Sequence, residues 1–230
     1  MIWILFIGTM ALSLLAAWHV KSVYRRHNQI SVRSGMTGAH VAAEILRRKQ
    51  IYDVEIAMGE GVLGDHYDPM HKRLVLSPDN FHGRTPAALG VSAHECGHAI
   101  QHAIAYKPLH WRMAAVGITT KANYVVMLLP MLGLMTGLIQ PFTGAIIMAV
   151  AWGVIMMFNL VTLPVEFDAS RRAKAVLADF RYIQAGDEAN AVKKVLDAAA
   201  LTYVAAFVTS LAYLLWHLLP LLTGGNRSRD

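Results

Sequence analysis

The segment HECGH at residues 94–98 contains the side chains whose types and spacing are best suited to chemistry. On a helix, His94 and His98 lie on one face, about 6 Å apart along the axis, and Glu95 lies a quarter-turn to the side. Two imidazoles placed in this way can bind one zinc ion, and a neighbouring carboxylate can take a proton from the water that the metal activates. The pattern is short, and three ordinary polar residues on a helix surface would also satisfy it. Its context therefore decides between the two interpretations.

A catalytic zinc ion usually has three protein ligands and an open position for water, so a third ligand must come from elsewhere in the chain. Glu166 and Asp168 are the first acidic side chains after Pro164, which follows a long apolar run. We favour Glu166 because it comes first, at the start of a polar helix that Pro164 is expected to begin. Asp168 is the alternative.

The HECGH segment is expected to lie on a helix with recognisable ends. Thr85 is a capping residue followed by Pro86 at the first helical position, which is typical of a helix start. The helix is expected to run to about Ala105, where the pair Lys107–Pro108 ends it.

Charged residues are scarce in this chain and unevenly distributed. Only 16% of its 230 residues are charged and the mean hydropathy is +0.40, whereas a soluble domain usually has about 25% charged residues. No Asp, Glu, Lys or Arg occurs in residues 1–20 or 198–225, and Lys121 is the only one in residues 113–164. Apolar runs of this length are typical of membrane-spanning helices. The sequence therefore predicts a membrane protein with two polar parts.

We expect a mainly α-helical protein with about four transmembrane helices. The predicted order is a transmembrane anchor at 1–20, a catalytic region with the HExxH helix at 21–112, a transmembrane hairpin at 113–164, a helix carrying the third ligand at 165–197, a fourth transmembrane helix at 198–222 and a polar tail at 223–230. Basic residues follow the first apolar run, which favours an uncleaved anchor over a cleaved signal peptide.

The catalytic region is expected to combine helices with a small sheet. Residues 34–50 have the apolar spacing of an amphipathic helix, with Thr37 as its N-cap. Residues 52–77 contain short apolar runs separated by turn residues, which predicts one or two β-hairpins, one of them turning between Asp68 and His71. The edge of such a sheet can bind an extended peptide through backbone hydrogen bonds, and a purely structural hairpin is the alternative.

The distribution of basic residues predicts the orientation in the membrane. Residues 21–112 contain twelve Lys and Arg and residues 165–197 contain six, whereas the connection between the second and third spans contains none. By the positive-inside rule both polar parts face the cytoplasm and both termini lie outside. The net charge of +6 does not indicate nucleic acid, because the basic residues are mixed with acids beside apolar spans. Cys96 is the single cysteine, so an intramolecular disulfide is excluded.

Several motifs along the chain resemble one family. The segment HECGH followed by AIQH, preceded by DHYDP and LVLSPDNF and followed far downstream by LPVEFDASRRA, resembles the YugP-like membrane zinc metallopeptidases, a bacterial family also described as neutral zinc metallopeptidases. The similarity covers nearly the whole chain. It implies a membrane-embedded, zinc-dependent endopeptidase with a gluzincin-like site and one catalytic zinc ion. Because the family is bacterial, the expected location is the bacterial inner membrane, with the active site on the cytoplasmic side that the positive-inside rule predicts.

The resemblance implies roles for individual residues. The residues that match the gluzincin zinc ligands are His94, His98 and Glu166. Glu95 matches the general base. Many gluzincins have an aspartate four residues after the ligand glutamate, where it orients a zinc-bound histidine; here that position is Ser170. Ser170 and Asp168 are therefore both candidates for this orienting role.

Peptide hydrolysis is the expected reaction, with Glu95 as the base that takes a proton from water and passes it to the leaving amine. The negative oxygen that forms on the carbonyl needs a hydrogen-bond donor besides the zinc. The candidate donors are His66, Tyr67, His82, His102 and Arg171. The expected partners are a peptide or protein substrate and the lipid bilayer, with no nucleic acid, and a regulatory membrane partner is left open.

Two other functions are compatible with the motif. An intramembrane (site-2-type) protease would have HExxH within a membrane span, but here Arg84, Lys107 and Arg112 flank the motif helix, which is too polar for a lipid-facing span. A non-catalytic zinc-binding membrane scaffold would use the same ligands. It would leave Glu95 without a role.

Overall fold

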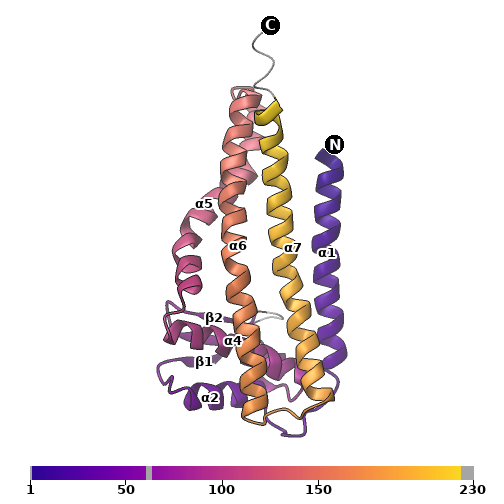
Figure 1. The fold of residues 1–230 in the computed structure, drawn as a ribbon, viewed down its shortest axis with the longest axis vertical. Helices are drawn as coiled ribbons and strands as arrows, with labels where there is room; N and C mark the ends of the chain where they lie inside the picture. The colour runs from indigo at the N-terminus through magenta and orange to yellow at the C-terminus, as the bar shows by residue number, and fades with distance from the viewer. Residues whose placement is uncertain (1, 61–63, 224–230) are drawn as a thin grey trace. The chain divides into compact units, whose positions relative to one another are not determined.

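The computed structural model describes residues 2–60 and 64–223, and it confirms a mainly helical chain with a small sheet. The elements are α1 (Ile2–His27), α2 (Gly38–Arg48), β1 (Glu55–Met58), β2 (His66–Asp68), β3 (Arg73–Leu76), α3 (Pro78–His82), α4 (Pro86–Ala103), α5 (Lys107–Thr136), α6 (Pro141–Asp179) and α7 (Asp187–Thr223) (Figure 1). The predicted polar tail lies outside the described residues, apart from Thr223.

The chain divides into two compact units. The apolar unit consists of Met1–Leu14, Trp111–Leu163 and Tyr203–Asp230. The polar unit consists of Leu15–His110 and Pro164–Thr202. The helices α1, α5, α6 and α7 each contribute residues to both units.

Four of the described helices, α1, α5, α6 and α7, are long and apolar enough to cross a membrane, as the sequence predicted. Their large apolar side chains point outward to an unusual degree, and in α1 Trp3 and Ile4 are 72% and 75% exposed. Apolar surface of this extent is unfavourable in water at about 25 cal/mol per Å². These helices therefore have the surface that a hydrocarbon environment requires.

The sequence prediction was wrong about Pro164. We expected this proline to end the third span and a new helix to begin at Glu166, but α6 continues without a break from Pro141 to Asp179 (Figure 1). A proline inside a helix removes one backbone hydrogen bond and bends the chain, but long apolar helices often accommodate it. As a result, Glu166 lies within a continuous helix, where its position is set more rigidly than at a helix end.

The motif helix has the ends that the sequence predicted. The hydroxyl of Thr85 accepts a hydrogen bond from the backbone N–H of Ala88 at 3.1 Å, and α4 ends at Ala103. The proline expected to end this helix, Pro108, instead lies in the first turn of α5. At the start of α2 the hydroxyl of Thr37 accepts from the His40 N–H at 3.2 Å, which confirms it as the N-cap.

The sheet has three strands in the order β1–β3–β2. Strands β2 and β3 are antiparallel, and the Asp68 carboxylate accepts hydrogen bonds from the backbone N–H groups of Met70 and His71 in the turn between them. The predicted hairpin at this turn is therefore confirmed. Strand β1 pairs with β3 in parallel, which hairpin signals could not indicate. The apolar residue Val62, within the segment expected to form strands, lies outside the described residues.

One hydrophobic core holds the polar unit together. Its fully buried side chains come from five elements, and they include Val41 and Ile45 of α2, Leu74 and Leu76 of β3, Leu89 and Ala93 of α4, Leu177 of α6 and Val192 of α7. Because α4 contributes to this core along its length, the core fixes the position of HECGH against α6.

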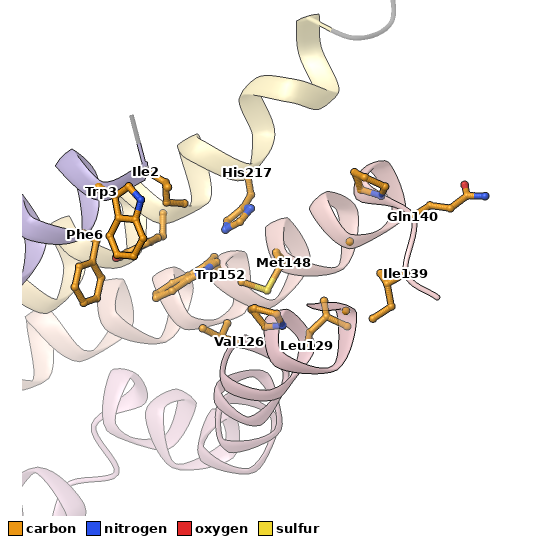
Figure 2. Close-up of a pocket in the computed structure, with 15 residues that line it drawn as sticks. Ile2, Trp3, Phe6, Val126, Leu129, Ile139, Gln140, Met148, Trp152 and His217 are labelled. Atoms are coloured by element: carbon orange, nitrogen blue, oxygen red, sulfur yellow. The ribbon is translucent and has the colours of Figure 1, made fainter. Parts of the chain in front are cut away.

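The apolar unit contains a cavity of about 870 Å³. Figure 2 shows Val126, Met148, Trp152 and His217 around it, and Trp152 stacks on Tyr213 with ring centroids 4.5 Å apart. Its lining is almost entirely apolar and contains no residue of α4. The cavity is therefore separate from the side chains of HECGH.

Helices α4 and α6 lie very close together at Gly97. A Cβ atom built on Gly97 would lie 2.7 Å from the carbonyl oxygen of Ala169 and 3.0 Å from its Cα. These are backbone atoms, which cannot rotate away as the end of a flexible side chain can. Gly97 therefore permits a helix separation that a larger residue would prevent.

We expect Gly97→Ala to lower the melting temperature of the detergent-solubilised protein. Overpacking costs about 1–3 kcal/mol, which exceeds the roughly 1 kcal/mol that alanine gains over glycine in a helix. For a chain of this size, each kcal/mol corresponds to about 2–4 °C. Circular dichroism or the fluorescence of a fused reporter during heating measures the change.

Gly90→Ala in the same helix is the matched control. Its added Cβ would meet the Val192 side chain at 3.4 Å, which is an ordinary contact. We expect the melting temperature of this variant to be unchanged or raised. Equal melting temperatures for Gly97→Ala and the unmodified protein would contradict the close approach of α4 and α6.

Candidate metal centre

Three buried side chains from two helices converge in the polar unit. The Nε2 atom of His94 lies 3.2 Å from Oε2 of Glu166, and the Nε2 atom of His98 lies 3.6 Å from the same oxygen. The three side chains are 13%, 10% and 2% exposed, in the order His94, His98 and Glu166. One potential ligand atom of each lies within 4.8 Å of the other two. We call these three residues the HHE cluster.

The distances in the HHE cluster suit a zinc ion. Zinc binds imidazole nitrogen and carboxylate oxygen at about 2.0–2.2 Å in tetrahedral geometry, so two of its ligand atoms lie about 3.4 Å apart. The two nitrogen-to-oxygen distances, 3.2 and 3.6 Å, lie on either side of this value. Two histidines and a glutamate are also a known ligand set of catalytic zinc, which leaves a fourth position for water.

The charges around the HHE cluster favour a cation. Burial alone would lower the pKa of His98, but the hydrogen bond with Glu166 and the negative charges of Glu95 and Glu166 outweigh it and raise the pKa. The same two carboxylates would stabilise a divalent ion held by the two imidazoles. Glu95 itself is 7% exposed and follows His94 directly in α4.

Ser170 contacts the first histidine. Its hydroxyl oxygen lies 3.1 Å from Nδ1 of His94, on the side of the ring away from Glu166. Ser170 and Glu166 are one helical turn apart in α6, so both side chains reach the same ring. Of the two residues proposed from the sequence to orient a histidine, Ser170 is the one that contacts His94.

Asp168 reaches the second histidine through a residue that the sequence analysis did not identify. Gln101 is fully buried, with Oε1 3.0 Å from Nδ1 of His98 and Nε2 2.9 Å from a carboxylate oxygen of Asp168. A polar residue three positions after His98, on the same helix face, was the available signal. The contact between Gln101 and Asp168 could not be predicted from the sequence, because it depends on how α4 and α6 pack.

Tyr67 and His102 form a pair one helical turn beyond His98. The Tyr67 hydroxyl lies 2.8 Å from Nδ1 of His102. Burial and the charges of Asp53 and Asp68 raise the pKa of Tyr67 to about 12, and burial together with His110 and Lys72 lowers the pKa of His102. At neutral pH the Tyr67 hydroxyl and the His102 imidazole are therefore both uncharged. The pair lines a polar pocket of about 320 Å³.

The remaining candidate donors point to other partners. Nδ1 of the exposed His66 lies 2.7 Å from the carbonyl oxygen of Gly64, and the exposed His82 ring packs edge-on against Phe81. The Arg171 guanidinium pairs with Asp168. Each of these contacts occupies the side chain at a place other than the HHE cluster.

Comparison with known proteins identifies the class to which this fold and site belong. A family model described as "Putative neutral zinc metallopeptidase" matches residues 2–222. The chain belongs to this neutral zinc metallopeptidase family. It is 39% identical over 222 residues to a protein of Bacillus subtilis (strain 168) named "Putative membrane protease YugP", and the match covers 96% of this chain and 97% of that relative. No solved structure matches the chain.

We expect Glu166→Gln to reduce the zinc content of the purified protein while the fold is retained. The substitution keeps the shape of the side chain but removes the negative charge between the two imidazoles, and a neutral amide is a poor zinc ligand. Zinc is measured by mass spectrometry of metals after dialysis, with circular dichroism as the check on folding.

Glu44→Gln is a suitable control for this measurement. Glu44 is a partly exposed acid on α2 that pairs with Arg47, so its loss should leave the zinc content unchanged. Full zinc occupancy in Glu166→Gln would assign the third ligand to another residue.

Proposed function

We propose that this protein is a membrane-embedded, zinc-dependent endopeptidase that hydrolyses peptide bonds. The observation that carries the proposal is the HHE cluster, with Glu95 buried beside it. Membership of a zinc metallopeptidase family supports the same reaction. The proposed site holds one zinc ion, with His94, His98 and Glu166 as its ligands.

The chain's own residues have separate tasks in this reaction. When bound, zinc polarises the scissile carbonyl and lowers the pKa of its water towards neutrality. Glu95 accepts the proton of that water and later delivers it to the nitrogen of the leaving amine. His94, His98 and Glu166 hold the metal, and their burial keeps competing water away from it.

The buried Glu95 favours an enzyme over a non-catalytic zinc scaffold. Glu95 is only 7% exposed, and an ionised carboxylate is costly to bury. Zinc proteases need such a base next to the first ligand, whereas a purely structural zinc site is closed by four protein ligands and needs none. The HHE cluster provides three.

The position of α4 favours a site outside the lipid over an intramembrane protease. Helix α4 is not among the four candidate membrane spans of the described chain. It begins after Arg84, and Lys107 and Arg112 follow it within the first turns of α5. We therefore propose that the polar unit is cytoplasmic and that the four apolar helices lie in the bacterial inner membrane.

A peptide or protein in extended conformation is the proposed substrate. Strand β2 lies at one edge of the sheet, and Tyr67 in this strand contacts His102 of the motif helix. An edge strand has backbone groups that can pair with an extended peptide. The proposal includes no nucleic-acid partner, and it assigns the basic residues to the membrane surface.

We expect Glu95→Gln to retain its zinc and lose cleavage. Removal of a general base reduces turnover by about 10²–10⁴-fold, whereas the three ligands are unchanged. Cleavage of an unfolded protein substrate by the detergent-solubilised protein, together with the zinc content of the same sample, measures both effects. Undiminished cleavage would exclude Glu95 as the base, and cleavage that persists after zinc chelation would contradict a zinc enzyme.

Membrane orientation is tested with single cysteines in a Cys96→Ala background. Met70, in the turn of the hairpin, is 78% exposed, and Leu138, between α5 and α6, is 84% exposed. A membrane-impermeant maleimide added to intact cells should label Leu138→Cys but not Met70→Cys. In permeabilised cells the maleimide should label both variants. Labelling of Met70→Cys in intact cells would reverse the proposed orientation.

A further inference from the structure

Gln101 makes three polar contacts although its side chain is fully buried. Its Oε1 lies 3.0 Å from Nδ1 of His98, and its Nε2 lies 2.8 Å from the carbonyl oxygen of Val165 and 2.9 Å from Oδ2 of Asp168. The amide therefore connects the second histidine of the motif with two acceptors on α6.

The chemistry of these partners allows only one orientation of the amide. A carbonyl and an ionised carboxylate can only accept hydrogen bonds, so the group that faces them must be the NH₂ with its two protons. If the amide were rotated by 180°, its oxygen would face two other oxygens. The Gln101 oxygen must therefore face His98, and Nδ1 of His98 must carry the proton that it donates to this oxygen.

We propose that Gln101 is a positioning residue that relays the charge of Asp168 to His98 and thereby presents Nε2 of His98 to the metal. With Nδ1 protonated, Nε2 is the only ring nitrogen with a lone pair for a ligand bond. This inference rests on the proposed zinc site, since it assigns a role towards that metal.

Asp168 is itself held in place by two cations. The guanidinium groups of Arg171 and Arg172 pair with its two carboxylate oxygens, and the Asp168 side chain is only 3% exposed. The relay therefore begins at an ion pair near the surface and ends at the HHE cluster. The carboxylate acts through an intervening amide, where many zinc sites have direct contact between carboxylate and histidine.

The two histidines are constrained differently. Ser170, which contacts Nδ1 of His94, has a hydroxyl that can either donate or accept a hydrogen bond. It orients the ring but does not dictate which nitrogen is protonated. Gln101 both orients the His98 ring and determines which of its nitrogens is protonated, because Val165 and Asp168 fix the orientation of the Gln101 amide.

The test compares zinc affinity in Gln101→Met, Asp168→Asn and the double variant, by competition with a chromophoric chelator. Methionine fills nearly the same volume as glutamine but cannot replace its hydrogen bonds with His98 and Asp168. We expect a 10–100-fold loss of zinc affinity in Gln101→Met, in line with the loss of a residue that supports a metal ligand. Asp168→Asn should lose less, about 3–10-fold, because asparagine can still accept from Gln101.

The double variant distinguishes a relay from two independent effects. If Asp168 acts through Gln101, the double variant should bind zinc no more weakly than Gln101→Met alone, because additivity fails within one network. Losses that multiply would overturn the relay. Ser170→Ala combined with Gln101→Met should instead show losses that multiply, since the two residues contact different histidines.

Ser92→Ala is the matched control for burial. Ser92 is a fully buried polar residue in the same helix, and its hydroxyl has no hydrogen-bond partner among the described residues. Its zinc affinity should equal that of the unmodified protein. Wild-type affinity in Gln101→Met would overturn the inference and leave the proposed zinc site intact, whereas a wild-type protein that binds no zinc would refute the site itself.

A measurement on the unmodified protein remains decisive if Gln101→Met does not fold. In the zinc-loaded protein labelled with ¹⁵N-histidine, we expect one Nδ1 proton that exchanges slowly with solvent, because it is buried and hydrogen-bonded to Gln101. Zinc bound to Nδ1 of His98 would overturn the inference.

Discussion

The burial of the Glu166 carboxylate between two imidazoles is the constraint on which the polar unit depends. With its side chain 2% exposed, this charge has given up nearly all contact with water, so the protein must supply its partners. His94 and His98 lie 3.2 and 3.6 Å from one of its oxygens. The elements that share the hydrophobic core with α4 and α6 help to hold these three groups together.

Two sets of contacts meet this requirement. The core formed by α2, β3, α4, α6 and α7 sets the relation of the two helices, and polar residues on α4 and α6 orient the rings. Ser170 reaches one histidine directly, and Gln101 reaches the other with Asp168 behind it. When hydrogen bonds to the Nδ1 atoms already orient the two rings, the site needs little rearrangement to accept a metal. This is the general advantage of preorganised sites.

Local features of the site could be predicted from the sequence. The spacing of His94 and His98 and the cap at Thr85 depend only on neighbouring residues, and the helix forms as expected. The hairpin turn at Asp68 is local in the same sense. The scarcity of charge predicted four long apolar helices, and the described chain has four.

Features that depend on packing could not be predicted in this way. Pro164 was expected to end a helix, but α6 continues through it. The parallel pairing of β1 with β3 depends on a crossover that no turn signal records. Gln101 lies three residues after His98, but the orientation of its amide depends on Val165 and Asp168, more than sixty residues away.

The close contact at Gly97 changes how the motif itself should be read. HExxH is normally written with two unrestricted positions. In this chain Cys96 is packed inside the core, and Gly97 faces the backbone of Ala169 so closely that even an alanine there would require the backbone to shift. The informative pattern is therefore HExGH, in which the glycine records the presence of a second helix. The glycine in this sequence pattern therefore reports the packing of α4 against α6. With one more position specified, HExGH is less prone to chance matches than HExxH.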